Sequence, residues 1–382
     1  MTVPGPLTFE ELERFLQELE ALAPHAPARS TSVAYRRVAD EEIVDDSLSE
    51  EPPPPEEGAE EPPVDHRGRE PLPPGAEVAV DLVAGRAGPV AAVDTGIVRL
   101  GETENGLVIA LRSTLVSDSG SGSEMRLVRS GPIYLHNDHK LTVLHQVGRH
   151  LGREDLFVEL DLADRGNPRP IRVKAGVADD AHQYGDRFRN WLERLVQQAA
   201  VTVVENGIVL LDGALTLRTR DTPRLFVERL AEAAGRAGNA LIAISKQSRL
   251  QIRGRAVRFW LNDVPNHACY RRLTDLMDQG EGAERVLGNL YAIRFSPAGP
   301  TFRADVMPPP GQSDQEAIQQ LQASALMRGG YPDILVRAHT FSFFTSPDVL
   351  NLQAQAGAMY RLVPQPDVDL AAIFGPFGGR FK

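Results

Sequence analysis

Residues 204–217 read VENGIVLLDGALTL, a run of strand-forming residues that stops on an aspartate followed by glycine. Asp-Gly is common turn chemistry, so the pair predicts a turn where a strand ends. The run before it is apolar enough to lie inside a sheet, and a carboxylate there is costly unless it is paired or binds a metal. Asp212 is therefore either an ordinary turn residue or a ligand placed at the end of a buried strand.

A second aspartate stands in the same setting. PVAAVDTGIVRL (89–100) is an apolar, strand-like run broken at Asp94-Thr95-Gly96, and we expect it to form a hairpin with LVIALRSTLV (107–116). Two carboxylates at the ends of neighbouring strands would suit a divalent cation such as Mg²⁺ or Mn²⁺, which prefer oxygen ligands. Two unrelated turns are the alternative.

The rest of the folded body mixes helices with strand pairs. This order indicates α+β or α/β with a partly antiparallel sheet. The expected elements are a helix over 183–200, a second hairpin in VTVVENGIVLLDG turning at 205–207, a helix over 222–237, the strand NALIAIS, the pair LYAIRFS and TFRADVM, and a helix over 313–328.

Composition divides the chain into four parts. Residues 1–39 hold a predicted amphipathic helix, TFEELERFLQELEALA, which opens with a capping box formed by Thr8 and Glu11. Residues 40–75 are rich in Pro and Glu and cannot bury enough apolar area to fold, which predicts a disordered linker. We expect the folded body over 76–365 and a tail over 366–382.

The net charge of −11 reflects one segment rather than the whole chain. Residues 38–70 contain thirteen acidic side chains and two arginines, so the remainder of the chain is nearly neutral. The net charge therefore does not exclude nucleic acid as a partner. Cys269 is the only cysteine, which excludes an intrachain disulfide and favours a reducing compartment. Neither a signal peptide nor an apolar membrane span is evident, and we expect a cytoplasmic protein.

Several of these motifs, in this order and spacing, resemble the NurA nucleases, prokaryotic DNA-end-processing enzymes that work with a HerA-type hexameric ATPase. The resemblance covers about Val90 to His339. Besides AAVDTGIVRLGE and GIVLLDGALTL, it rests on RNWLERL, IAISKQSRL, LYAIRFSP with FRADV, and GYPDILVRAH. It implies an α/β protein with an RNase H-like core, a mixed sheet, flanking helices and small β and helical additions.

The resemblance also assigns residues. It makes Asp94, Glu193 and Asp212 the metal-binding carboxylates, adds Asp305, and gives His339 as the histidine of the site. Asp305 departs from the family, which often has a glutamate at or near this position. Periodicity alone would place Glu193 on a solvated helix face, and a histidine in so apolar a region is commonly a core residue.

A basic set is expected to contact DNA. The resemblance places Lys246 and Tyr291 beside the DNA backbone, and the densest basic run of the body adds arginines suited to phosphate contacts. An exposed strand with solvated arginines is the alternative for that run. Its members are Arg249, Arg253, Arg255 and Arg258.

The function that these assignments imply is metal-dependent hydrolysis of DNA. Two ions, Mn²⁺ or Mg²⁺, would lower the pKa of a water and offset charge on the leaving oxygen, while Lys246 offsets charge on the phosphate. The resemblance implies 5′-to-3′ exonuclease and single-strand endonuclease activity on DNA ends, in repair, end resection or defence. It also implies a homodimer and docking on the ATPase, for which the N-terminal helix and the Phe-rich tail are candidates. The alternatives are an inactive partner of the ATPase and an RNase H-like nuclease for RNA or hybrids.

Overall fold

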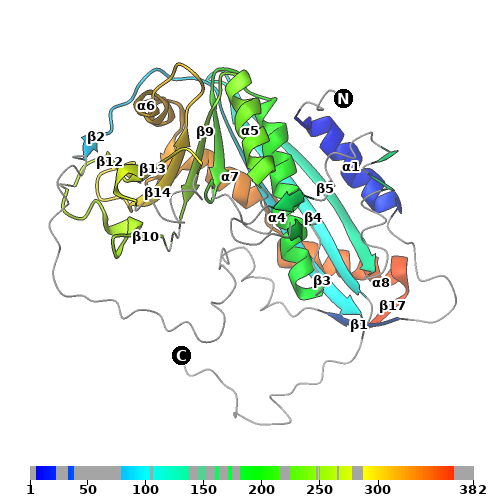
Figure 1. Ribbon diagram of the computed structural model, residues 1–382. Helices are drawn as coiled ribbons and strands as arrows, with labels where there is room; N and C mark the ends of the chain where they lie inside the picture. Colours follow the sequence, from blue (N-terminus) through cyan, green and yellow to red (C-terminus); the bar gives the residue numbers. More distant parts are fainter. Residues whose placement is uncertain are drawn as a thin grey trace, which may run out of the picture.

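The computed structural model forms one large sheet with helices on both faces (Figure 1). The residues it describes are 6–22, 33–37, 79–103, 106–136, 146–147, 149–150, 160–162, 171–173, 181–215, 224–246, 248, 250–264, 266–277 and 287–364. The predicted linker over 40–75 and the tail over 366–382 lie outside these ranges, as does Arg249.

The centre of the sheet is built from three antiparallel strands followed by two parallel ones. β3 (Val90–Thr103), β4 (Gly106–Asp118) and β5 (Ser123–His136) pair antiparallel in sequence order. Helix α4 (Ala181–Val201) then leads to β8 (Ile208–Asp212), which pairs parallel with β3. Helix α5 (Arg224–Arg236) leads to β9 (Ala240–Ser245), parallel to β8. The spatial order β5-β4-β3-β8-β9 with these directions is that of an RNase H-like core, as predicted.

Further strands extend this core on one side. β14 (Phe302–Met307) pairs antiparallel with β9, and β13 (Asn289–Arg294), β12 (Cys269–Arg272) and β2 (Val80–Asp81) follow in turn. β1 (Val33–Arg37) pairs with the far end of β3 and with β17 (Leu362–Pro364). Three two-stranded ribbons complete the described strands: β6 (Leu160–Leu162) with β7 (Ile171–Val173), β10 (Gln251–Ile252) with β11 (Arg255–Ala256), and β15 (Met327–Arg328) with β16 (Tyr331–Pro332).

Alternate residues of the central strands face two different cores, because side chains along a strand point to opposite faces. Val93 and Leu211 lie in a core with α1 (Phe9–Leu22), α4 and α5. Ala92 and Leu210 lie in a second core with α6 (Asp314–Ser324) and α7 (Asp333–Ser342). Helix α8 (Ser346–Tyr360) covers β3 and β4 further along, in a third cluster. Two 3-10 turns, Val257–Phe259 and Thr274–Leu276, belong to a small fourth cluster around β12.

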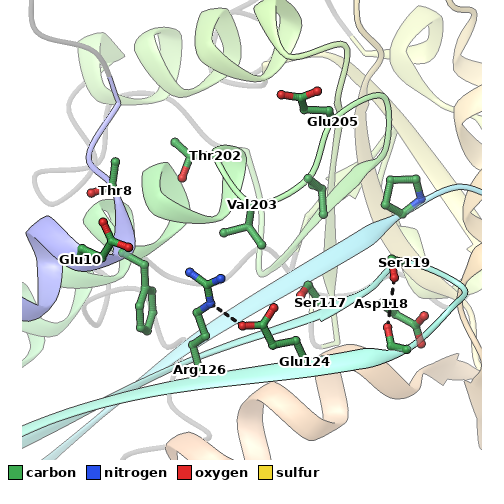
Figure 2. Close-up of a pocket in the computed structure, with 14 residues that line it drawn as sticks. Thr8, Glu10, Ser117, Asp118, Ser119, Glu124, Arg126, Thr202, Val203 and Glu205 are labelled. Carbon is green, nitrogen blue, oxygen red and sulfur yellow. Dashed lines mark hydrogen bonds and ion pairs between the residues drawn. The ribbon is translucent and has the colours of Figure 1, made fainter.

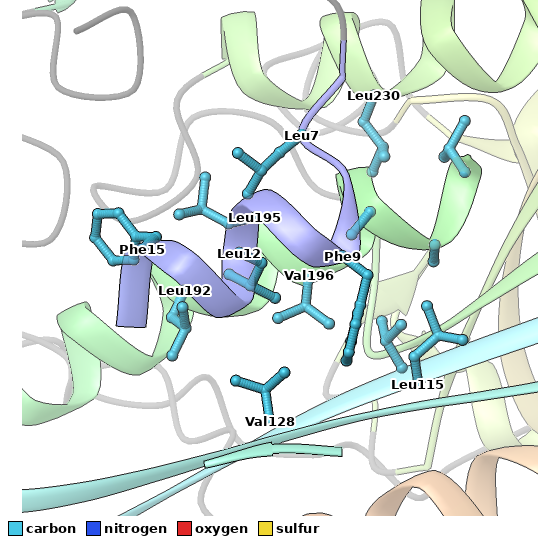
Figure 3. Close-up of a cluster of buried hydrophobic side chains, with 14 of the residues drawn as sticks. Leu7, Phe9, Leu12, Phe15, Leu115, Val128, Leu192, Leu195, Val196 and Leu230 are labelled. Atoms are coloured by element: carbon cyan, nitrogen blue, oxygen red, sulfur yellow. The ribbon is translucent and has the colours of Figure 1, made fainter. Parts of the chain in front are cut away.

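The N-terminal helix forms where predicted, and the core buries its apolar stripe. Thr8 and Glu11 make the expected reciprocal capping bonds, with Thr8 N donating to Glu11 Oε2 at 2.8 Å and Glu11 N to Thr8 Oγ1 at 3.2 Å. Leu12, Phe15 and Leu16 are each at most 1% exposed in the first core, and Leu12 and Phe15 pack beside Leu192 and Leu195 of α4 (Figure 3). The stripe is therefore occupied within the chain, and the helix does not offer it to a partner ATPase.

Two local predictions are wrong. Residues 201–207 contain no strand, because α4 ends at Val201 and residues 202–207 form the loop that leads to β8. Within this loop, Val204 lies in the first core and Val203 packs against it. The predicted break in β3 at Asp94-Thr95-Gly96 is also absent, because β4 pairs with β3 continuously through these residues. The other expected helices and strands are present, with bounds shifted by a few residues.

Candidate active site

Asp94 and Asp212 lie level with each other on neighbouring parallel strands. The β3–β8 register pairs Val93 with Leu211, the last partners before the two aspartates. Both aspartates follow residues that face the first core, so by alternation both point to the opposite face, which α7 covers. Adjacent strands are about 4.8 Å apart, so the two carboxylates share one region of that face.

The strand pairing along one edge of β3 is interrupted next to Asp94. The edge of β3 that does not pair with β4 is occupied by β8 at residues 90–93 and by β1 at residues 101–102. Among the described strands, none pairs with that edge between these two contacts. β8 ends at Asp212, and Gly213 leaves the sheet with a positive φ of 104°. Asp94 is thus at mid-strand, beside the gap created where its neighbour ends.

Helix α7 brings two polar side chains onto Asp94. His339 Nδ1 lies 3.0 Å from Asp94 Oδ2, and Ser342 Oγ donates a hydrogen bond to the same oxygen. Burial raises the pKa of Asp94, but the hydrogen bonds from His339 and Ser342 and the nearby charges outweigh it, so the pKa is lowered from its ordinary value. An ionised carboxylate only accepts hydrogen bonds, so Nδ1 of His339 carries the proton of this contact.

A glycine permits this close approach. A Cβ atom built on Gly96 would lie 2.2 Å from the backbone oxygen of Ser342, well inside contact distance. Gly96 is two residues beyond Asp94 and therefore shares its face of β3. The end of α7 can reach Asp94 because this position has no side chain.

Asp212 has its own pair of partners. Lys246 Nζ lies 2.6 Å from Asp212 Oδ2, and the Tyr331 hydroxyl donates to Oδ1 at 3.3 Å. Lys246 directly follows β9, whose Ile244 pairs with Asp212 and faces the second core, so Lys246 points to the same face. Its ammonium also lies 5.3 Å from the centre of the Tyr331 ring, which is buried against Phe302. The structure therefore brings together Asp94, His339, Asp212 and Lys246 around one opening.

Glu193 does not join this group. It lies on α4, whose Leu192 and Leu195 pack on the first core, the face opposite the two aspartates. Its carboxylate accepts a hydrogen bond from Gln197 Nε2 at 2.9 Å. Within the described part of the chain, no three His, Cys, Asp or Glu side chains are grouped closely enough to hold a metal ion. The metal role given to Glu193 by resemblance stays a prediction.

Asp305 also lies on the opposite face. Its neighbours Ala304 and Val306 belong to the second core, so Asp305 points toward the first. It is fully buried, and Arg303 binds both of its oxygens at 2.8 Å while the Leu215 amide donates to Oδ2 at 2.8 Å. The structure gives this carboxylate a buried ion pair that ties β14 to the segment after β8, and does not bring it to Asp94.

Tyr291 is a core residue rather than a surface one. It is 5% exposed, stacks edge-on against Tyr270, and donates its hydroxyl to Asp314 at 2.7 Å. β13 places its side chain under α6, which is why a contact with a DNA backbone does not follow from its position.

Ser342, Tyr331 and Gly96 are contacts of the site that sequence reasoning missed. Ser342 follows His339 by three residues on a helix, which places both side chains on one face. That spacing could have suggested Ser342 once His339 was chosen. Tyr331 lies within the GYPDILVRAH motif, but no local pattern joins it to an aspartate 119 residues earlier.

A cavity of about 500 Å³ lies away from this site, between the start of α1, the β4–β5 turn and the loop after α4 (Figure 2). Four of its lining residues are acidic: Glu10, Asp118, Glu124 and Glu205. Its arginine, Arg126, is paired with Glu124 at 2.8 Å. None of the predicted site residues lines it, and its charge does not suit a polyanion.

No helix in the described ranges combines the length and apolar character needed to cross a lipid bilayer.

Comparison with solved structures returns nucleases at low similarity. The NurA nuclease from Sulfolobus solfataricus has a TM-score of 0.47 at 13% identity, covering 73% of this chain and 86% of that one. Endonuclease V of Ciona intestinalis, in complex with inosine-containing DNA, has a TM-score of 0.34 at 10% identity, covering 69% and 86%. Because these scores lie below 0.5, the fold assignment rests on the strand order and pairing described above.

Comparison of sequences gives one group of relatives. No family model matches the chain. UPF0102 protein BURPS1106A_3900 of Burkholderia pseudomallei strain 1106a is 30% identical over 114 residues, which are 29% of this chain and 74% of that protein. A UPF0102 protein of Burkholderia mallei strain NCTC 10229 matches with the same identity and coverage. Over that stretch the chain belongs to the UPF0102 family, whose name states no activity.

Proposed function

We propose that this chain hydrolyses phosphodiester bonds, as a nuclease acting on DNA. The observation that carries the proposal is the pair Asp94 and Asp212, level on neighbouring parallel strands and pointing to one face beside an opening in the sheet. Each carboxylate touches a group that can be cationic, His339 and Lys246 respectively. Such a mixture of acids and bases beside the end of β8 suits phosphoryl chemistry more than structural support.

The residues of this opening fit a hard divalent cation. Asp94 and Asp212 supply carboxylate oxygens, and Oδ1 of Asp94 receives no hydrogen bond from the described residues. Mg²⁺ is often held by only one or two carboxylates, with water and phosphate oxygens filling the other positions. A bound ion would lower the pKa of a water and offset the negative charge of the phosphate. Mn²⁺ would be accepted by the same oxygens.

The chain's own side chains have defined tasks in this proposal. Lys246 neutralises Asp212 in the free protein and turns to a non-bridging phosphate oxygen when substrate arrives. Asp94 holds the His339 ring through Nδ1, which leaves Nε2 to exchange a proton with the leaving oxygen. Ser342 and Tyr331 keep the two carboxylates in fixed orientations.

The finer assignments rest on the sequence resemblance to NurA nucleases. On that basis the substrates are DNA ends, cut 5′ to 3′ and within single strands, by a homodimer that works with a HerA-type hexameric ATPase in the cytoplasm. A second ion and the participation of Glu193 belong to this same set of proposals.

A cleavage assay tests the proposal. Wild-type protein is incubated with end-labelled single- and double-stranded DNA in Mn²⁺, in Mg²⁺ and in EDTA. We expect cleavage only with metal, and a loss of at least about 100-fold for Asp212→Asn. Asp118→Asn, in the β4–β5 turn away from this site, where the carboxylate accepts a hydrogen bond from the Gly120 amide, serves as the matched control. Intact DNA with wild type in both metals, with and without a cognate ATPase, would rule out the proposed activity.

A further inference from the structure

The segment between β9 and β12 presents an aromatic side chain on a basic surface. The β10–β11 ribbon turns at Arg253 and Gly254, both with positive φ, and leads into the 3-10 turn Val257–Phe259. Phe259 is 44% exposed, although it follows the buried Val257 of the same turn. The guanidinium of Arg258 lies 4.9 Å from the centre of the Phe259 ring.

Among the described residues, no carboxylate pairs with two of the arginines here, whereas a third arginine is paired. Arg253 and Arg258 are exposed, and none of the acidic side chains in the described residues forms an ion pair with either. Arg255 instead lies over the buried Trp260 ring, pairs with Asp263 at 3.6 Å and donates to the backbone oxygen of Phe259. Asp263 is itself held by Arg271 at 3.1 Å. Among the described residues around Phe259, positively charged side chains therefore outnumber negatively charged ones.

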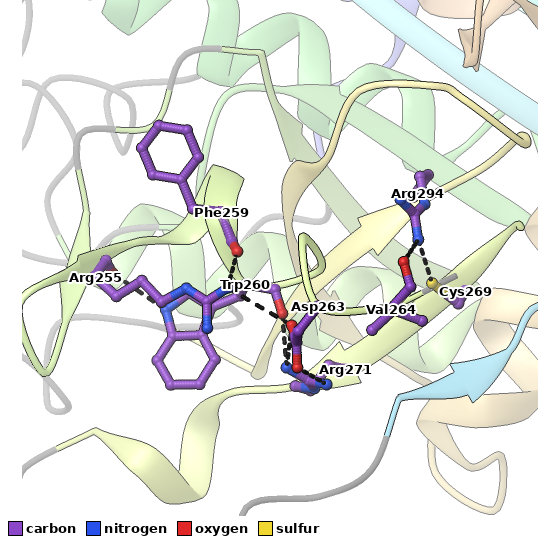
Figure 4. A network of polar contacts seen from close by, with 8 residues as sticks. All are labelled: Arg255, Phe259, Trp260, Asp263, Val264, Cys269, Arg271 and Arg294. Carbon is purple, nitrogen blue, oxygen red and sulfur yellow. Dashed lines mark hydrogen bonds and ion pairs between the residues drawn. The ribbon is translucent and has the colours of Figure 1, made fainter. Parts of the chain in front are cut away.

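The exposed ring stands on a rigid support (Figure 4). Trp260 Nε1 donates to Arg255 O at 3.1 Å, and Arg271 Nη1 donates to Trp260 O at 2.7 Å. Trp260 and Leu261 lie in the small core around β12. Because these contacts hold the backbone that carries Phe259, less conformational entropy is lost when the ring binds a flat ligand. Arg255, predicted to contact DNA, is used to build this support.

Phe259 and its support lie near the candidate active site. Val257 N donates to Leu250 O at 3.1 Å, and Leu250 follows Lys246 by four residues, a span of at most about 14 Å. Lys246 in turn contacts Asp212. A strand of nucleic acid whose phosphate contacts Lys246 could therefore reach Phe259 within a few nucleotides.

We propose that Phe259, flanked by Arg258, is a stacking platform that binds an unpaired base of single-stranded DNA next to the active site. An aromatic face with a neighbouring cation accepts any unpaired base, while Arg258 contacts the backbone without reading sequence. Bases inside a duplex are already stacked and cannot reach the ring. The platform thus gives the proposed nuclease, on which this inference rests, a preference for single strands.

Binding measurements without metal test the platform separately from cleavage. Affinities for a labelled poly-dT oligonucleotide and for a duplex of equal length are measured by anisotropy in EDTA over a range of salt. Phe259→Ala is expected to weaken single-strand binding roughly tenfold, with little change for the duplex and an unchanged salt slope. Phe259→Trp retains the stacking face and is expected to keep wild-type affinity. Arg258→Gln is expected to lower the salt slope by about 1 for both ligands.

Leu350→Ala serves as the control, because it removes another exposed apolar side chain, on α8. Equal single-strand affinities for Phe259→Ala and wild type would overturn the platform, and if wild type still cuts DNA in Mn²⁺ the nuclease proposal stands. Wild-type protein that neither binds nor cuts DNA would contradict both the platform and the nuclease proposal. A drop in molecular mass for Phe259→Ala, seen by light scattering, would place Phe259 in a contact between copies and overturn the platform too.

Discussion

At the scale of single residues, Asp94 shows how environment rather than sequence defines a site. Its strand context is shared with Asp212, and both were found from an apolar run ending on aspartate. The contacts that set its charge come from residues about 245 positions away, His339 and Ser342. A side chain brought in by another helix leaves no trace in the local pattern, which is why Ser342 and Tyr331 were missed.

The charge of Asp94 predicts a pH dependence of stability. Its folded-state pKa lies below the ordinary value of 3.8, so ionised Asp94 stabilises the fold above that pH. This contribution disappears as the pH falls through the lowered pKa. We expect the difference in unfolding free energy between wild type and Asp94→Asn to shrink as the pH is lowered below 3.8. Urea unfolding at a series of pH values measures it, and a difference that grows in acid would contradict the assignment.

At the scale of elements, the approach of α7 to β3 depends on a glycine. Gly96→Ala would place a methyl group 2.2 Å from the Ser342 oxygen and push away the end of the helix that carries His339. We expect a loss of about 1 to 3 kcal/mol in unfolding free energy, together with a loss of cleavage. Gly122→Ala, whose added Cβ meets nothing within 4 Å, is the matched control. Full stability and activity of Gly96→Ala would show that α7 does not position the site.

The N-terminal helix makes a second prediction for an element. Leu16 is 1% exposed within the first core, so Leu16→Ala is expected to cost about 2 to 5 kcal/mol. Glu13→Ala, on the exposed side of the same helix, is expected to change stability by less than about 0.5 kcal/mol. Thermal or urea unfolding distinguishes the two. Equal stabilities of the two variants would mean that α1 does not contribute to the first core, as its separation from the rest of the fold along the sequence suggests.

At the scale of the whole molecule, the strands of the central sheet were predictable from the sequence, but the face to which each side chain points was less so. Apolar runs such as PVAAV and GIVLL mark buried strands, and the helices between them follow from amphipathic periodicity. The face to which a side chain points depends on register, which one residue reverses. Asp305 and Tyr291 were assigned to the site by resemblance, yet the register turns Asp305 to the opposite face and buries Tyr291 under α6.

The predicted hairpin at 205–207 failed for a related reason. Val203 and Val204 have strand propensity, but they close the first core at the end of α4, and tertiary packing overrides local preference. The helix therefore runs to Val201, and the connection to β8 is only a short loop.

The central claim is that Asp94 and Asp212 act as one hydrolytic centre, and a mutant cycle tests it most directly. Cleavage rates of end-labelled DNA in Mn²⁺ are compared for wild type, Asp94→Asn, Asp212→Asn and the double variant. Residues that work as a unit are strongly non-additive, so each single variant is expected to lose about as much activity as the double. Two single variants that cut at the wild-type rate, or losses that multiply as for independent sites, would contradict a shared centre.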